Sequence, residues 1–165
     1  WWHMAPESRP AWAWEDRPPA GYEPNKGVAA ARLAIQGLLA DVRKRYAPGA
    51  VTVVGFSQGA MLALDLGGRT ESGKDNVAAL SGVMLADSLA ALNDLAATHA
   101  RRLRFLLAHG FDDEEIPFQA ATKARDLLED NGQDVIWQPF PGGHTIPPQV
   151  VAAIRSFLLG DRMAI

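Results

Sequence analysis

Residues 51–59 read Val-Thr-Val-Val-Gly-Phe-Ser-Gln-Gly, a run of strand-forming residues that ends in the pattern Gly-x-Ser-x-Gly. This pattern is typical of a sharp turn between a buried strand and a helix, which exposes the serine hydroxyl above the end of the strand. The new helix directs its first N–H groups toward the group that Ser57 would attack. We expect a Cβ at Gly55 or Gly59 to collide with the turn or with the strand–helix packing. The stretch therefore predicts a nucleophilic serine.

The rest of the chain alternates between apolar strand-like runs and segments with helical periodicity. We expect strands at 51–56, 77–84, 103–108 and 135–140, and helices at about 25–46, 58–66, 88–99, 117–131 and 147–159. Strands that alternate with helices of this length predict an α/β fold, a mostly parallel sheet with helices on both faces. The first helix should pack one face on this sheet.

The length and composition bound the domain organisation. A chain of 165 residues, 48% of them hydrophobic, can bury one core, so we predict a single domain over residues 1–165. Residues 1–24 hold five prolines and four of the five tryptophans, which is typical of a loop attached to the body by its aromatic side chains. Residues 25–165 would form the core.

The net charge argues against two classes of partner, and the cysteine content bears on the location of the protein. A net charge of -3 gives no general attraction to nucleic acid or to anionic lipid, so we expect neither nucleic-acid binding nor stable membrane insertion. No apolar run approaches the roughly 20 residues that span a bilayer. The chain has no cysteine, which fits a reducing, cytoplasmic location.

Three candidate functional segments each follow a predicted strand and should lie at the same edge of the sheet. These segments are Ser57, the acidic loop that begins after residue 108, and His144 behind Gly142-Gly143. A serine hydroxyl needs a histidine to take its proton, and an acid must orient that imidazole. The order Ser, acid, His is the order of the α/β-hydrolases. The backbone N–H of Gln58 is placed to donate to an oxyanion.

The acidic loop leaves the identity of the acid open, since Asp112, Asp113, Glu114 and Glu115 are neighbours there. A metal site built from His109, Asp112, Asp113 and His144 is the competing interpretation, but these spacings match no metal-binding motif. We therefore predict neither a metal nor a cofactor. The simplest role for His109 is structural, at the end of its strand.

Four motifs together resemble the phospholipase/carboxylesterase family of α/β-hydrolases, which includes acyl-protein thioesterases and small bacterial carboxylesterases. They are Gly-Phe-Ser-Gln-Gly (55–59), Leu-Ser-Gly (80–82), His-Gly-x-x-Asp-x-x-Ile-Pro (109–117) and Gly-Gly-His-Thr-Ile (142–146). The resemblance covers roughly residues 25–160. It implies that Ser57 is the nucleophile, Asp113 the orienting acid, His144 the general base and Gln58 a backbone oxyanion donor.

The resemblance also implies a departure, because family members begin with two or three strands and a loop that supplies a second oxyanion N–H. Nothing in this sequence corresponds to them, so either the natural chain begins earlier or the domain is shortened at its N-terminus. An uncovered sheet edge would favour a homodimer.

The sequence thus predicts a serine carboxylesterase that acts on small acyl esters of short to medium chain length. An acyl thioesterase or lysophospholipase is the alternative within the same chemistry. A catalytically impaired binding module of the same fold is the alternative from another class.

Overall fold

The computed structural model describes residues 24–69, 75–97 and 103–160. Residues 1–23 of the Pro/Trp-rich segment and His99 lie outside these ranges, whereas Pro24, expected in that segment, is the first residue of the first helix. The elements in chain order are α1 (Pro24–Tyr46), β1 (Thr52–Phe56), α2 (Gln58–Gly67), β2 (Asn76–Leu80), α3 (Ala86–Ala97), β3 (Arg104–Gly110), α4 (Phe118–Asp130), β4 (Asp134–Phe140) and α5 (Pro148–Leu159). None of the helices in the described ranges combines the length and the apolar character needed to cross a membrane.

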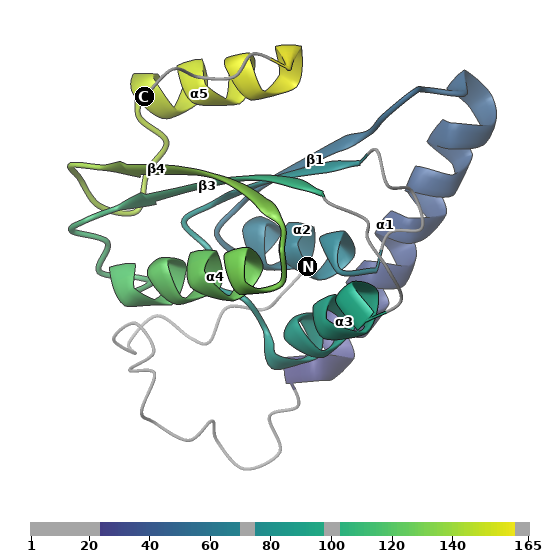
Figure 1. Ribbon diagram of the computed structural model, residues 1–165, viewed down its shortest axis with the longest axis horizontal. Coiled ribbons are helices and arrows are strands. Elements are labelled where there is room, and N and C mark those ends of the chain that lie inside the picture. The colour runs from purple at the N-terminus through teal and green to yellow at the C-terminus, as the bar shows by residue number, and fades with distance from the viewer. Residues whose placement is uncertain (1–23, 70–74, 98–102, 161–165) are drawn as a thin grey trace.

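The four strands form one sheet in the order β1-β2-β3-β4, and every neighbouring pair is parallel. Each crossover contains a helix, as parallel pairing requires. All the strands therefore end at the same edge of the sheet, where Ser57 and the loops after β3 and β4 begin (Figure 1). The predicted α/β fold with a parallel sheet is confirmed.

Helices cover both faces of the sheet (Figure 1). On one face, side chains of α2, α3 and α4 pack against β2 and β3 around Phe105, which is fully buried. On the other face, α5 places Val150, Ala153 and Phe157 against the alternate residues of the same strands. The period-two alternation of strand side chains explains why β2 and β3 are apolar on both sides.

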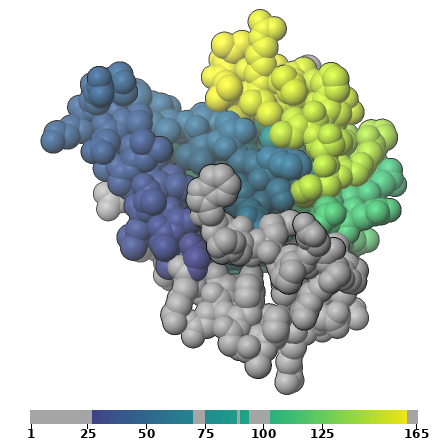
Figure 2. All heavy atoms as spheres, turned by 180° about the vertical axis from the view of Figure 1, so that it is seen from behind, coloured from purple at the N-terminus to yellow at the C-terminus, as the bar shows by residue number. Residues whose placement is uncertain are grey.

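The first helix differs from the prediction, because α1 packs mainly against α2 rather than on the strands. Its side chains Leu38 and Tyr46 are exposed, whereas Val28 is buried. Figure 2 shows α1, in purple and blue, on the opposite side of the visible face from α5, in yellow, with the β1–α2 region between them. The helical period is thus correct, but the expected contact with the sheet is wrong.

A buried carboxylate connects α1 to the helices next to it. Asp65 of α2 is fully buried and forms an ion pair with Arg32 of α1. It also accepts hydrogen bonds from Arg69 Nε at 3.2 Å and from Ser88 Oγ at 2.9 Å. Burial raises the pKa of this carboxyl group, but the hydrogen bonds from Arg32, Ser88 and Arg69 outweigh burial and lower it overall. Asp65 is therefore charged and fully paired, which a buried charge requires.

Several element boundaries differ from their predicted positions. The second strand ends at Leu80 rather than at 84, because Ser81 adopts a positive φ of 49°. Helix α3 begins at Ala86, two residues before the predicted start at 88, so Asp87 and Ser88 both lie inside the helix rather than capping it. The Ser88 hydroxyl bonds to Asp65. Pro117 precedes α4 as its N-cap residue rather than standing in its first turn.

Candidate active site

Ser57 lies between the end of β1 and the first residue of α2. Its backbone has φ 55° and ψ -119°, a conformation that a non-glycine residue rarely adopts and that costs about 1–3 kcal/mol. Two sets of hydrogen bonds hold this turn. The Ser57 N–H donates to the Leu80 carbonyl at 2.9 Å, and its carbonyl accepts from the N–H of Ala60 at 3.0 Å. The strained turn is the one that the Gly-x-Ser-x-Gly pattern predicts.

The two glycines of the pattern play different parts. A Cβ on Gly55 would lie 2.0 Å from the carbonyl oxygen of Gly59, so only glycine fits where the strand passes under the helix. A Cβ on Gly59 would meet no atom within 4 Å. The prediction is therefore confirmed for Gly55 and wrong for Gly59, which lies in the first turn of α2 with open space beside it.

Gln58 is the first residue of α2, and its side chain is exposed. The first N–H groups of an α-helix have no partner within the helix, and they lie at the positive end of the helix dipole. The backbone N–H of Gln58 thus follows Ser57 directly at a helix N-terminus. Its role as an oxyanion donor stays a prediction.

Asp113 lies in the loop between β3 and α4, and it is the one carboxylate of that acidic loop that points inward. It is 8% exposed, whereas Asp112, Glu114 and Glu115 are exposed. Its Oδ1 accepts hydrogen bonds from the backbone N–H groups of Glu115 at 3.0 Å and Ile116 at 2.8 Å. Its Oδ2 lies 2.8 Å from His144 Nδ1.

These contacts determine the charge of the carboxylate. Burial raises the pKa of Asp113, but the hydrogen bonds from the Ile116 N–H and from His144, together with the electrostatic effect of the two nearby imidazole rings, outweigh burial and lower it overall. Asp113 is therefore ionised at neutral pH. An ionised Asp113 accepts the Nδ1–H of His144, which leaves Nε2 of that ring as the atom able to take a proton.

His144 follows β4, and its ring reaches back toward the end of β1. The ring centroid lies 4.7 Å from that of Phe56, the residue immediately before Ser57. Within the described ranges, no hydrogen bond joins His144 to Ser57. Catalytic hydrogen bonds are often long in unliganded enzymes and shorten when substrate binds. The structure thus brings His144 and Asp113 into contact and places both at the edge where Ser57 stands.

Close backbone packing holds the loops after β3 and β4 against each other. The N–H of Asp112 donates to the Gly142 carbonyl at 2.9 Å. A Cβ on Gly110 would lie 2.2 Å from that carbonyl oxygen and 2.5 Å from the one of Gly143. Gly110 is therefore needed where the two loops pass each other, next to Asp113 and His144. The glycines of the His-Gly and Gly-Gly-His motifs are therefore the residues that pack against each other where the two loops meet.

We expect the ionisation of Asp113 to make folding stability depend on pH. Because the folded-state pKa lies below the unfolded value of about 3.9, Asp113 stabilises the fold above that value. This contribution is lost as the pH falls through the lower, folded-state pKa. Urea unfolding of the wild type and of Asp113→Asn between pH 6 and pH 3 should show a stability difference that is constant above about pH 5 and shrinks below about pH 4. A difference that stays constant down to pH 3 would contradict the lowered pKa.

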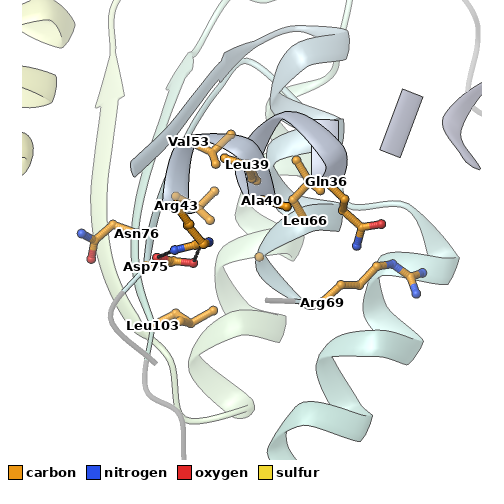
Figure 3. A pocket seen from close by; sticks show the side chains of 12 residues that line it. Gln36, Leu39, Ala40, Arg43, Val53, Leu66, Arg69, Asp75, Asn76 and Leu103 are labelled. Atoms are coloured by element: carbon orange, nitrogen blue, oxygen red, sulfur yellow. Dashed lines mark hydrogen bonds and ion pairs between the residues drawn. The ribbon is translucent and has the colours of Figure 1, made fainter. Parts of the chain in front are cut away.

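A cavity of about 340 Å³ lies at the other end of the sheet, beside the first residues of β1 and β2. Figure 3 shows Arg43 of α1 paired there with Asp75, and leucine and valine side chains form much of the remaining wall. Arg69, at the rim, donates to Asp65 and to the Asp87 carbonyl. Because this cavity lies at the amino ends of the strands, it is separate from the edge that carries Ser57 and His144.

Two features of the site were missed by sequence reasoning. The contact between Phe56 and His144 has no sequence signal beyond the position of Phe56 before the serine. His109 has the local structural contact expected of it, since its Nε2 lies 2.8 Å from the Ile116 carbonyl oxygen. The same Nε2 also lies 3.3 Å from Asp113 Oδ2, and this second contact was not predicted. The His-Gly-x-x-Asp spacing could have indicated that second contact.

Comparison with known proteins agrees with this geometry. The family model described as Phospholipase/Carboxylesterase matches residues 3–160. The chain is 25% identical over 138 residues to acyl-protein thioesterase 1 of Gibberella zeae, covering 82% of this chain and 59% of that protein.

Solved structures share the fold. The crystal structure of esterase PE8 superposes with a TM-score of 0.71 at 31% identity, over 83% of this chain and 63% of that one. Acyl-protein thioesterase 2 of Zea mays superposes with a TM-score of 0.60 at 17% identity, over 88% of this chain and 69% of that one.

The chain therefore spans about three-fifths of the length of esterase PE8 and of the Gibberella zeae thioesterase. The family match nevertheless extends over almost all of its residues and includes all four motifs. By its sequence and its fold, the chain belongs to the phospholipase/carboxylesterase family of α/β-hydrolases.

Proposed function

We propose that the chain is a serine carboxylesterase that hydrolyses carboxylic esters of short to medium acyl length. The observation that carries the proposal is the 2.8 Å contact between His144 Nδ1 and Asp113 Oδ2, at the sheet edge where Ser57 stands in its strained turn. An ionised, buried acid that orients a histidine has its main use in activating a nucleophile. The similarity to esterase PE8 supports an ester as the substrate.

The proposed reaction proceeds in two steps through an acyl-enzyme. Ser57 Oγ attacks the ester carbonyl while His144 Nε2 takes the hydroxyl proton, and the imidazolium then protonates the departing alcohol. The Gln58 N–H stabilises the oxyanion. Water, deprotonated by His144, then attacks the acyl-serine and releases the acid. These steps use side chains, backbone and water only, so the proposal includes no metal and no cofactor.

Two alternatives remain open to experiment. An acyl thioesterase or lysophospholipase uses the same groups, and the similarity to acyl-protein thioesterase 1 supports it. A binding module of the same fold is the second alternative. It is favoured if the chain lacks a second oxyanion donor, whose loss costs about 10²- to 10³-fold in rate.

The proposed function is tested by rapid mixing of the protein with p-nitrophenyl acetate and p-nitrophenyl butyrate. We expect a burst of p-nitrophenolate that scales with enzyme concentration, because acylation of Ser57 releases the alcohol before water cleaves the acyl-enzyme. Acid quenching followed by peptide mass spectrometry should find the acyl group on the peptide that contains Ser57.

The matching thioester and lysophosphatidylcholine serve as the comparison substrates. A higher kcat/KM for either one would replace the carboxylesterase proposal with the first alternative. A folded protein that neither hydrolyses these substrates nor carries the acyl group would favour the binding module.

The remaining parts of the proposal concern partners and location. The proposed partner is a small acyl ester. We propose no nucleic-acid partner, and we propose a cytoplasmic location. Among the residues that the structure describes, strand β1 lies at one edge of the sheet and Val54 at its centre is 46% exposed. The proposal therefore includes a homodimer formed through this edge.

A further inference from the structure

His109, the second-last residue of β3, is buried beneath the proposed acid–base pair with 1% of its surface exposed. Its Nε2 lies 2.8 Å from the Ile116 carbonyl oxygen and 3.3 Å from Asp113 Oδ2. The sequence assigns this residue a local structural role. The contact with Asp113 connects it to the site.

The partners of Nε2 determine which tautomer His109 adopts. A carbonyl oxygen only accepts hydrogen bonds, so Nε2 must carry the proton. Nδ1 is then the unprotonated nitrogen, and within the described ranges it is buried without a hydrogen-bond partner. A charged ring would bury a second N–H with nothing to accept it, and burial lowers the pKa of His109. His109 is therefore neutral and donates from Nε2.

His109 lies beside one oxygen of the Asp113 carboxylate and holds the backbone that binds the other. Directly, His109 Nε2 lies 3.3 Å from Oδ2, the same oxygen that His144 contacts. Indirectly, His109 holds the Ile116 carbonyl, and the N–H of the same residue donates to Oδ1 at 2.8 Å. The ring therefore fixes the backbone that orients one oxygen while it faces the other.

We infer that His109 is a positioning residue that holds Asp113 in the orientation needed to align His144. The inference rests on the proposed function, since it assigns His109 a part in that same site. His109 touches no substrate and transfers no proton in the reaction. A merely structural histidine would affect folding stability without changing the turnover of the folded enzyme.

The test compares His109→Gln and His109→Leu in the full chain. The glutamine amide nitrogen can take the place of Nε2 and donate to the Ile116 carbonyl, whereas leucine fills the space without a donor. For p-nitrophenyl butyrate we expect His109→Leu to lower kcat by about 10- to 100-fold with KM changed by less than about twofold, and His109→Gln to stay within about fivefold of the wild type.

A control separates positioning from lost stability. Ser88→Ala removes a buried hydrogen bond to Asp65, whose hydrogen bonds and ion pairs within the described ranges include none of Ser57, Asp113 and His144, and should lower the urea midpoint while kcat is retained. Equal kcat values for His109→Leu and the wild type would overturn the inference, as would a kcat for His109→Gln as low as that of His109→Leu. If His109→Leu does not fold, His109→Asn, whose amide is one carbon shorter, replaces it with the same expectations.

A second readout does not depend on turnover. The proton shared between His144 Nδ1 and Asp113 should give a low-field NMR resonance that is absent from His144→Gln. We expect this resonance to persist in His109→Gln and to broaden or shift in His109→Leu, and an unchanged resonance in His109→Leu would overturn the inference. If hydrolysis does not depend on Ser57, the proposed function fails, and the resonance alone then decides whether His109 positions the pair.

Discussion

Replacing Ser57 with alanine should lower kcat/KM for p-nitrophenyl butyrate by about 10⁴- to 10⁶-fold, leaving only the rate supplied by binding and backbone donors. The physical reason is that the methyl group of alanine cannot form an acyl-enzyme, so the proposed two-step route is closed. The turn itself should persist, because its hydrogen bonds to Leu80 and Ala60 use only the backbone of residue 57. Stopped-flow release of p-nitrophenolate measures the change.

Ser88→Ala provides the matched control, because it makes the same chemical change, serine to alanine, at a buried serine of α3 that contacts Asp65. We expect this variant to retain kcat/KM within about twofold while it loses stability. If Ser57→Ala keeps most of the wild-type activity, the nucleophile is not Ser57 and the proposed reaction is wrong.

Replacing Gly55 with alanine should destabilise the fold by about 3–4 kcal/mol or prevent folding. Its Cβ would lie 2.0 Å from Gly59 O and 2.7 Å from Ala60 N, which are backbone atoms of the first turn of α2. The helix could yield only by moving away from β1, and it would carry the Ser57 turn with it. Urea unfolding followed by circular dichroism measures the loss.

Gly59→Ala is the paired control within the same motif. The added Cβ meets open space in a helical first turn, so we expect this variant to be neutral or up to about 1 kcal/mol more stable. If Gly55→Ala and Gly59→Ala change the free energy of unfolding by similar amounts, the close packing of Gly55 against the first turn of α2 does not determine the stability of the turn.

The sequence predicts the fold well because its signals are local and repeated. Apolar strand runs alternate with helical periods along the chain, and the parallel sheet with helices on both faces follows from that alternation. The errors concern element boundaries and tertiary contacts. Periodicity shows that α1 has an apolar face, but it does not reveal that the helix packs mainly against α2 and pairs Arg32 with Asp65.

The candidate site is predicted in part. Spacing alone identifies the acidic loop but not which acid faces inward, and the resemblance to the family selects Asp113 over Asp112. The structure gives the physical reason, since the N–H groups of Glu115 and Ile116 turn that one carboxylate toward His144. The contact between His109 and Asp113 was missed because it depends on the loop bringing Asp113 back to the end of the strand, which only the His-Gly-x-x-Asp spacing indicates.

The order of the strands has a consequence for how the chain folds. Each strand pairs with its successor in the sequence, and aligned partners are about 30 residues apart or fewer. Because the entropy cost of loop closure grows with loop length, these pairings cost less than pairings between strands farther apart in the chain would. The sheet can therefore grow in the order of synthesis, from β1 toward β4. The turn that displays Ser57 needs only β1 and β2 for its hydrogen bond to Leu80, whereas the contact between Asp113 and His144 must wait for the last strand. A nascent chain can therefore carry the nucleophile before it can activate it.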